Sequence, residues 1–238
     1  MMMSEQLSSP WRHWRHVVKL DPARTICDQA LQAIAASGTD AVFLGGTQDI
    51  TYENTNALLG RLRRLAPNLP LWQEISTVDA VVDGVDGYAI PLVLNTADPH
   101  WLIGAHAEAI EKYGSWIDWN KVLVEGYLVL HQAAAVAKLT KANVNLTASQ
   151  AAAYALAAET LFSIPVLYIE YSGTFGDPAL LAEIARTTRR AHLFYGGGID
   201  SYEKAAAMAE HADTIIVGNA LYADNWRTVL ADTIRAVK

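Results

Sequence analysis

The chain has 238 residues, of which 52 % are hydrophobic and 18 % charged, a composition that excludes an intrinsically disordered protein. Its formal net charge is −7 and it contains no long basic run, so we expect no nucleic-acid partner. The one cysteine, Cys27, cannot form an intrachain disulfide, which favours a reducing cytoplasm as the location.

The first segment in chain order, residues 1–10, is polar and lacks an apolar core, so we expect no signal peptide. No later run of about 18 apolar residues predicts a membrane span. Instead, eight short apolar runs follow one another, as expected for parallel strands buried on both faces. The predicted strands cover 16–20, 40–45, 70–75, 87–92, 122–129, 165–170, 192–195 and 214–217.

Segments with helical periodicity follow most of these strands. Asp177 and Ser201 are expected to cap the helices that start after them, and Gly38 is expected to end the first helix. Only residues 77–86 separate the third strand from the fourth, which is too few for a crossover helix and predicts an extended or single-turn connection. The predicted helices cover 26–36, 53–65, 99–113, 148–162, 178–189, 202–211 and 224–237.

Eight strands alternating with helices predict one α/β domain over residues 1–238, a modified (β/α)8 TIM barrel that lacks the helix between strands three and four. A doubly wound open sheet is the alternative, but the even spacing of eight strands favours a closed barrel. Active sites of such barrels lie at the C-terminal ends of the strands. Residues at these ends are therefore the first candidates for function.

The strongest local signal is glycine at the ends of the last two strands. Gly196, Gly197 and Gly198 follow the seventh strand, and Gly218 with Asn219 follows the eighth. Glycine lets backbone N–H groups approach an anion, and a neighbouring helix start adds a favourable dipole. Barrel enzymes often bind phosphate between these two loops. Tight turns that need a positive φ are the alternative, but two such ends on adjacent strands favour phosphate binding.

The first two strands end in residues that suit phosphate and metal binding. Alternation along the strand points Lys19 and Asp21 to the same side, so Lys19 could offer charge to a phosphate and Asp21 could ligate Mg2+. A surface ion pair is an equally good interpretation. Thr47 follows Gly45 and Gly46, whose small size allows a diphosphate to approach, and its hydroxyl could join a magnesium shell. In isolation, a turn in which Thr47 caps a helix is the simpler reading.

The sixth strand carries a candidate base. Alternation places Tyr168, Glu170 and Ser172 on one face, where Glu170 could accept hydrogen bonds from substrate hydroxyls or remove a proton. A buried carboxylate satisfied by neighbouring donors is the alternative. Glu74 and Glu125 invite the same two interpretations, and for them a structural role is favoured.

Several other chemistries lack their motifs. The chain contains no GxxxxGK[ST] loop, which excludes a Walker-type nucleotide site. No set of cysteine and histidine has zinc spacing, and His106 and His131 are expected to be structural.

Eight stretches together carry a family resemblance: HVVKLDP (16–22), SGTDAVFLGGT (37–47), IPLVLN (90–95), WLIGAHAEAIEKYG (101–114), VEGY (124–127), YIEYSGTFGDP (168–178), FYGGGI (194–199) and VGNALY (217–222). They run from about Trp14 to the last helix. Their combination and order are highly specific. The chain resembles the geranylgeranylglyceryl/heptaprenylglyceryl phosphate synthase family, most closely its bacterial heptaprenyl branch.

The resemblance implies a prenyltransferase that forms an ether lipid precursor. The C3 hydroxyl of sn-glycerol 1-phosphate attacks C1 of a polyprenyl diphosphate, and diphosphate leaves. The resemblance also implies a homodimer, Mg2+ bound by Asp21 and Thr47, and a catalytic pair of Lys19 and Glu170, of which Glu170 holds or deprotonates the hydroxyl. The residues it assigns to glycerol 1-phosphate are Lys19, Tyr168, Ile169, Glu170, Tyr171, Ser172, Gly173, Gly198, Gly218 and Asn219.

The helix predicted around 101–113 bears on prenyl chain length. Leu102, Ala105, Ala109 and Tyr113 lie near one stripe of it, and ordinary packing on the barrel is one explanation. The resemblance adds another, because relatives that take a C20 chain carry a bulky tryptophan at the position of Ala109. Alanine there implies an open groove, passing Ala109 and Tyr113, and a heptaprenyl (C35) donor. Geranylgeranyl (C20) specificity with the same chemistry is the alternative.

Two other functions stay open from the residues alone. A phosphosugar isomerase or cyclase would use the same phosphate loops, but it predicts paired acid and base residues and no long apolar groove. A non-catalytic barrel would bind prenyl diphosphate without turnover. The loop 131–134 lacks the Asn-Pro element usual in relatives, which affects substrate detail more than reaction class. An apolar product also implies transient contact with a membrane.

Overall fold

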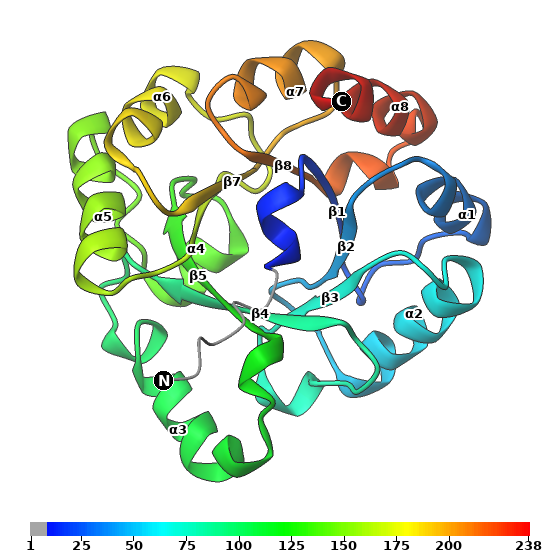
Figure 1. Cartoon of the computed structure of the whole chain (residues 1–238), viewed down its shortest axis with the longest axis horizontal. Helices are drawn as coiled ribbons and strands as arrows, with labels where there is room; N and C mark the ends of the chain where they lie inside the picture. The colour runs from blue at the N-terminus through cyan, green and yellow to red at the C-terminus, as the bar shows by residue number, and fades with distance from the viewer. Residues whose placement is uncertain (1–8) are drawn as a thin grey trace, which may run out of the picture.

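The computed structural model describes residues 9–238 and confirms the predicted barrel. The polar start predicted over 1–10 lies almost entirely outside the described residues. Each strand pairs in parallel with its neighbours in the chain, and β8 pairs with β1, which closes the sheet and excludes the open alternative (Figure 1). The strands are β1 (His16–Leu20), β2 (Ala41–Leu44), β3 (Leu71–Glu74), β4 (Gly87–Val93), β5 (Val122–Val129), β6 (Val166–Glu170), β7 (His192–Gly196) and β8 (Thr214–Val217).

Helices surround the barrel, close to the predicted positions (Figure 1). The side chains of Asp177 and Ser201 accept hydrogen bonds from backbone N–H groups of the helices they precede, as predicted. None of these helices in residues 9–238 is both long and apolar enough to cross a bilayer. The outer helices are α1 (Asp28–Ala36), α2 (Tyr52–Leu65), α3 (Gly104–Tyr113), α5 (Ala148–Leu161), α6 (Pro178–Thr187), α7 (Tyr202–Ala209) and α8 (Trp226–Val237).

The connection between β3 and β4 contains only a single 3-10 turn, Val78–Ala80, which confirms the missing crossover helix. Two helix predictions need correction. The helix expected from residue 99 begins as α3 at Gly104, because Pro99–Trp101 form a separate 3-10 turn capped by Asp98. The helix α4 (Ala135–Thr140) was not predicted, because six residues are too few to establish a helical period.

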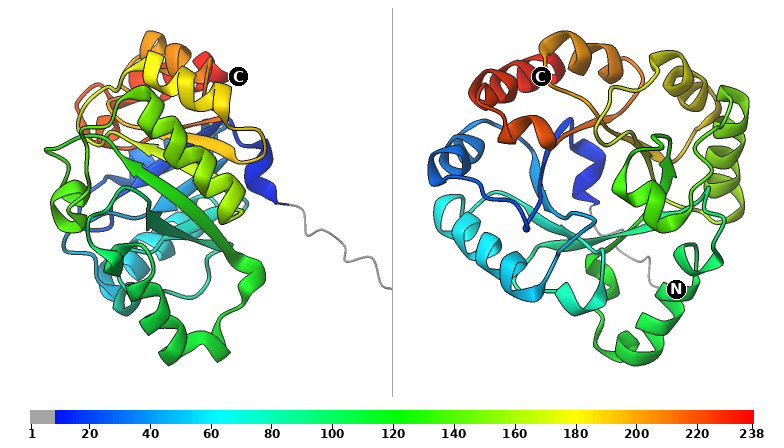
Figure 2. Two further views of the ribbon diagram at one scale, coloured as in Figure 1. Left: turned by 90° about the vertical axis from the view of Figure 1, so that its left-hand side faces the viewer. Right: turned by 180° about the vertical axis from the view of Figure 1, so that it is seen from behind.

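One end of the barrel is closed by aromatic side chains. The 3-10 helix Pro10–His13 and the following Trp14 lie at the ends of the strands where β1 and β8 begin (Figures 1 and 2). The Trp14 ring makes edge contacts with Phe43 and Trp72, at centroid distances of 5.8 and 5.5 Å, and stacks near Phe194. Any opening for substrate must therefore lie at the opposite end, where the strands finish.

We call Trp14 and its ring contacts Phe43, Trp72 and Phe194 the aromatic plug, and its truncation should destabilise the fold. Trp14→Ala removes a buried ring with three aromatic neighbours, so we expect the free energy of unfolding to fall by about 3–5 kcal/mol in chemical denaturation followed by circular dichroism. Trp116→Ala is the matched control, because the Trp116 side chain is 87 % exposed and its loss should change stability by less than about 0.5 kcal/mol. Equal, small changes in both variants would show that the plug does not stabilise the barrel.

Candidate active site

Lys19 points into the barrel from β1 and forms an ion pair inside it. Its Nζ lies 2.7 Å from Oε1 and 2.8 Å from Oε2 of Glu74, at the end of β3. The same Nζ donates to the hydroxyl of Tyr127 at 3.2 Å, and that hydroxyl donates to Glu74. The Tyr127 and Tyr168 rings stack 4.4 Å apart, with the ammonium 5.3 Å from the Tyr168 ring centroid. The cation of Lys19 is thus held within the barrel.

Three carboxyl groups set the charge around this lysine. Burial disfavours the ammonium of Lys19, but the carboxylates of Glu74, Glu170 and Glu125 outweigh burial and raise its pKa. Lys19 therefore stays protonated at neutral pH. Glu74 is a buried carboxylate held by two neighbouring donors, Lys19 and Tyr127, which agrees with the structural role favoured for it.

Glu125 lies completely buried on β5 beneath this pair. Burial raises the pKa of its carboxyl well above the ordinary value, and the charge of Glu74 raises it further. Neither carboxyl oxygen has a hydrogen-bond partner among residues 9–238. Burial thus disfavours a negative charge on Glu125, while the charges of Lys19 and Glu74 balance each other.

Glu170 ends β6, beside Lys19. Burial raises the pKa of its carboxyl, and although the Lys19 charge and the Ser172 hydrogen bonds pull it down, the pKa remains raised. The backbone N–H of Ser172 donates to Oε1, which leaves Oε2 without a partner among the described residues. A partly neutralised carboxylate with one free oxygen can accept a hydrogen bond from a hydroxyl and take its proton.

The remaining residues of the stretch after β6 differ in what they can contact. Ile169 is fully buried in the layer between barrel and helices, and the half-buried Tyr171 packs against the same layer. Ser172 and Gly173 are exposed, and Ser172 O accepts a hydrogen bond from the His131 ring at 2.7 Å, which agrees with a structural role for His131. The structure thus brings Tyr168 and Glu170 to Lys19, but directs the side chain of Ile169 away from it.

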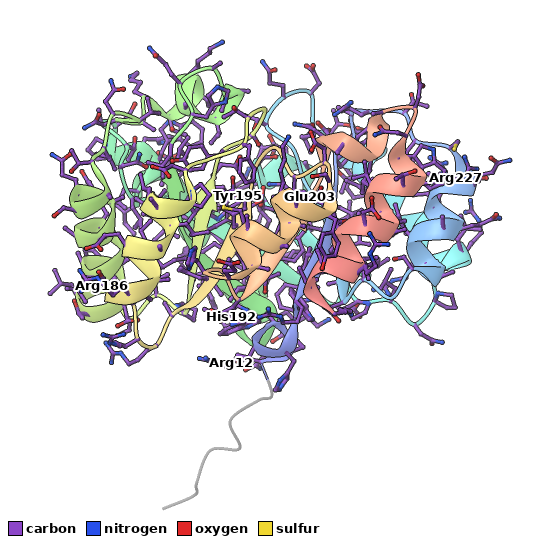
Figure 3. All side chains as sticks on the ribbon, turned by 90° about the horizontal axis from the view of Figure 1, so that it is seen from above. Arg12, Arg186, His192, Tyr195, Glu203 and Arg227 are labelled. Atoms are coloured by element: carbon purple, nitrogen blue, oxygen red, sulfur yellow. The ribbon has the colours of Figure 1, made fainter. Side chains whose placement is uncertain are left out.

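The loop after β7 packs tightly against the loop after β6. Gly197 and Gly198 have φ values of 150° and 59°, and a Cβ at Gly198 would lie 2.3 Å from the backbone nitrogen of Phe175. The Tyr195 hydroxyl joins the two loops, accepting from Gly176 N at 2.8 Å and donating to Gly197 O at 3.1 Å. Figure 3 shows Tyr195 farther from the aromatic plug than His192 on the same strand. The glycines are therefore required both by backbone conformation and by close contact.

The N–H groups of these glycine loops are available to a ligand. Gly218 lies beside β1, where a Cβ would be 3.2 Å from Lys19 O. Within residues 9–238, no acceptor receives a hydrogen bond from the N–H groups of Gly197, Gly198, Gly218 or Asn219. These four residues are half-buried or exposed. The positive φ values bear out the turn interpretation, and N–H groups without protein acceptors are compatible with an anion site, so the phosphate interpretation stays a prediction.

Asp21 and Thr47 lie on adjacent loops at the ends of β1 and β2. A Cβ at Gly46 would lie 2.8 Å from the carboxylate of Asp21, so the two loops are in close contact. Asp21 accepts from Ala23 N and has no cationic partner among the described residues. Thr47 caps no helix, since the capping box of α2 is formed by Thr51 with Asn54, and the simpler reading of Thr47 is wrong.

The donor set at Asp21 and Thr47 fits Mg2+ better than a metal that needs a full protein cage. Residues 9–238 contain no group of three or more histidine, cysteine, aspartate or glutamate side chains that could hold a metal. Mg2+ usually binds through one or two carboxylates and takes its other ligands from water and substrate phosphates. A carboxylate at Asp21, and a hydroxyl at Thr47 next to the Gly46 that approaches it, meet that description.

The helix α3 stands at the edge of the molecule, outside β4 (Figures 1 and 2). The four predicted stripe residues Leu102, Ala105, Ala109 and Tyr113 are all half-buried, and none of the residues of α3 is fully buried. By contrast Ala107, on a different face of the helix, is exposed. The four residues are thus better covered than Ala107, and both interpretations of Ala109 stay open.

Known proteins resemble the chain over nearly its full length. The sequence pattern of the PcrB family matches residues 9–238. The heptaprenylglyceryl phosphate synthase of Brevibacillus brevis is 49 % identical over 228 residues, which cover 96 % of this chain and 97 % of the relative. The protein of the same name from a Geobacillus species (strain WCH70) is 43 % identical over 227 residues, covering 95 % and 98 %.

Two solved structures have the same fold. One is (S)-3-O-geranylgeranylglyceryl phosphate synthase from Thermoplasma acidophilum in complex with its substrate sn-glycerol-1-phosphate, with a TM-score of 0.86 and 22 % identity, covering 100 % of this chain and 99 % of that one. The other is wild-type GGGPS from Thermoplasma volcanium, with a TM-score of 0.84 and 23 % identity, covering 95 % and 93 %. At such identities the likeness establishes the shared barrel.

The raised pKa of Glu125 predicts an unusual stability change. Because its pKa is higher in the folded protein than in the unfolded chain, ionisation of the unfolded chain lowers stability as pH rises above about 4.5. Glu125→Gln should therefore raise the free energy of unfolding at pH 8, by about 1.4 kcal/mol for each unit of pKa elevation, and change it little near pH 4. Denaturant titrations at the two pH values measure this.

Glu159→Gln provides the control of opposite sign. Glu159 is also buried, which disfavours its charge, but three backbone N–H groups of residues 189–191 outweigh burial and lower its pKa. Its replacement should lower stability at pH 8 by about 1–3 kcal/mol, with a smaller loss near pH 4. A Glu125→Gln protein that is less stable than wild type at pH 8 would mean that Glu125 is ionised and paired in the fold.

Proposed function

The chain belongs to the PcrB family, and from this premise we infer that it is a prenyltransferase of lipid biosynthesis. It joins heptaprenyl diphosphate to the C3 hydroxyl of sn-glycerol 1-phosphate, releasing diphosphate and forming an ether lipid precursor. The observation that carries this function is the 49 % identity to a heptaprenylglyceryl phosphate synthase across 96 % of the chain. The phosphosugar isomerase and the non-catalytic barrel find no such support.

We place the phosphate of glycerol 1-phosphate on the N–H groups of Gly198, Gly218 and Asn219. The support for this placement is that these groups have no acceptor among residues 9–238 and lie on adjacent loops. Lys19 is a poor alternative ligand for the phosphate, because its ammonium is already paired with Glu74. Lys19 instead suits the glyceryl part of the substrate, together with Tyr168 and Glu170, while Ile169, Tyr171, Ser172 and Gly173 shape the loop around it.

Glu170 is our candidate for holding and deprotonating the attacking hydroxyl. Its raised pKa makes the carboxylate a stronger base than an exposed glutamate, and Oε2 is free to accept the proton. With the phosphate anchored on the glycine loops, the hydroxyl is presented to the prenyl C1 as in an intramolecular reaction. The bond from C1 to the hydroxyl oxygen forms, the bond from C1 to diphosphate breaks, and the proton passes to Glu170.

Asp21 and Thr47 are proposed to hold Mg2+, and their donor set fits it. When bound, Mg2+ neutralises charge that develops on the departing diphosphate. The diphosphate would then lie over the loops after β1 and β2, next to the glycerol phosphate. The protein's own part is to present an unpaired carboxylate at Asp21 and to let Gly46 approach it closely.

A homodimer and transient membrane contact also remain proposals. Large apolar side chains are exposed at the C-terminal end of α5, where Leu161 and Phe162 are 75 % and 64 % exposed. Contiguous exposed apolar residues often mark contact surfaces. They support association with a second copy of the chain or with a lipid surface.

The function is tested by mixing the purified protein with Mg2+, labelled sn-glycerol 1-phosphate and prenyl diphosphates. With the wild type, we expect label in the organic phase. Asp21→Asn removes the charge that would bind the metal, so the rate of this variant should fall about 100-fold or more. Chelation of the metal should have the same effect on the wild type.

Asp224→Asn is the control for the metal site, because Asp224 is an exposed carboxylate in the loop before α8. It should transfer prenyl at the wild-type rate. Label that never enters the organic phase with the wild type would overturn the function, whereas full activity of Asp21→Asn would overturn only the metal site.

The chain-length proposal predicts the effect of filling the groove. Ala109→Trp should lower kcat/KM for heptaprenyl diphosphate by about 10-fold or more while sparing geranylgeranyl diphosphate, because each buried methylene contributes about 0.8 kcal/mol. Competition between the two donors measures the ratio. Ala107→Trp is the matched control, since Ala107 is exposed on the same helix and the ratio should not change. An unaltered ratio in Ala109→Trp would remove the groove from this face of α3.

A further inference from the structure

The loops after β1 and β8 are tied together at the mouth of the barrel. The guanidinium of Arg24 donates from Nη1 to Oδ1 of Asn219 at 2.8 Å and lies 3.7 Å from the ring centroid of Tyr222. The Tyr222 hydroxyl accepts from Asp21 N at 2.9 Å and donates to Asp21 O at 3.3 Å. Arg24 is therefore next to both proposed phosphoryl sites. Asp21 belongs to the metal site that would hold the diphosphate, and Asn219 belongs to the loops that would hold glycerol phosphate.

Arg24 keeps its charge available. Two other cations near the strand ends are paired, Lys19 with Glu74 and Lys204 with Asp200. Arg24 forms no ion pair with a carboxylate of the described residues, and its one hydrogen-bond acceptor is the neutral amide of Asn219. Stacking on Tyr222 holds the plane of the guanidinium, while Nε and Nη2 have no protein acceptor within residues 9–238.

The site needs such a cation. Glycerol phosphate and prenyl diphosphate both bring several negative charges to the mouth, where the carboxyl group of Glu170 also lies. The backbone N–H groups of Gly198 and Gly218 supply dipoles without a net charge. A magnesium ion balances part of the diphosphate, and the charge of Lys19 is balanced by Glu74. Arg24 provides an unbalanced positive charge at this position, in a form that matches phosphoryl oxygens.

We propose that Arg24 is a phosphoryl-binding residue of this active site, with Asn219 and Tyr222 holding its guanidinium in place. The proposal rests on the proposed function. Its free N–H groups donate to phosphoryl oxygens that come from one of two sources. One is glycerol phosphate, whose loops include Asn219, and the other is the prenyl diphosphate, whose metal would lie at Asp21.

The test is Arg24→Gln, which removes the charge and keeps a polar side chain of moderate length. Calorimetry without turnover measures binding of sn-glycerol 1-phosphate and, separately, of inorganic diphosphate with Mg2+. We expect the Kd of one ligand to rise about 10-fold or more, and the KM of the matching substrate to rise with it. The ligand affected identifies the source of the phosphoryl group. Arg24→Lys should recover part of the loss, because it restores the charge but not the planar fork.

Arg227→Gln is the matched control. Arg227 also lies over an aromatic ring, Trp226, at 4.3 Å from the centroid, and donates to a neutral amide, Gln29, at 3.0 Å. Figure 3 shows Arg227 on the outer ring of helices. Its loss should leave the Kd of both ligands unchanged, whatever it does to thermal stability.

The proposal is overturned if Arg24→Gln binds both ligands as tightly as the wild type, even when its melting temperature falls. Arg24 would then only connect two loops. Failure of the proposed function is read from a different measurement. Prenyl transfer by the wild type is measured by turnover, whereas the role of Arg24 is measured by anion binding in the calorimeter. The two outcomes are therefore separately readable.

Discussion

The ion pair between Lys19 and Glu74 determines how the mouth of this barrel can bind an anion. If Lys19 turned to a phosphate, the carboxylate of Glu74 would stay buried without its partner, at a cost of about 3–5 kcal/mol. Lys19 therefore stays paired with Glu74 inside the barrel. This pairing supports our proposal that the backbone N–H groups of the loops after β7 and β8 hold the phosphate, while the buried lysine and carboxyl groups contact hydroxyls.

The aromatic and the polar side chains of the barrel lie at opposite ends. Trp11 and Trp14 fill the end where the strands begin, while the polar side chains gather where the strands finish. Glu125 lies buried without a hydrogen-bond partner among residues 9–238, and its raised pKa disfavours a further negative charge near Lys19. Glu170, whose pKa is also raised, is the carboxyl group with an oxygen left to contact a hydroxyl in our proposal.

Local signals in the sequence were sufficient for the fold. Apolar runs located all eight strands, and Asp177 and Ser201 located helix starts, because these features depend on neighbours in the chain. The short helix α4 was not predicted, because its six residues are too few to show a helical period of hydrophobic residues. In the site, Lys19, Tyr168 and Glu170 came together as expected from alternation on parallel strands. The partners of these residues were not predictable, because Lys19 meets Glu74 across 55 positions and Arg24 meets Asn219 across 195.

The most direct test of the central claim is a crystal structure of the protein with sn-glycerol 1-phosphate. The phosphate oxygens should lie about 2.7–3.1 Å from the backbone nitrogens of Gly198, Gly218 and Asn219, with the Lys19–Glu74 pair intact and the glycerol hydroxyls near Glu170. A phosphate bound directly to Nζ of Lys19, with Glu74 displaced, would contradict it.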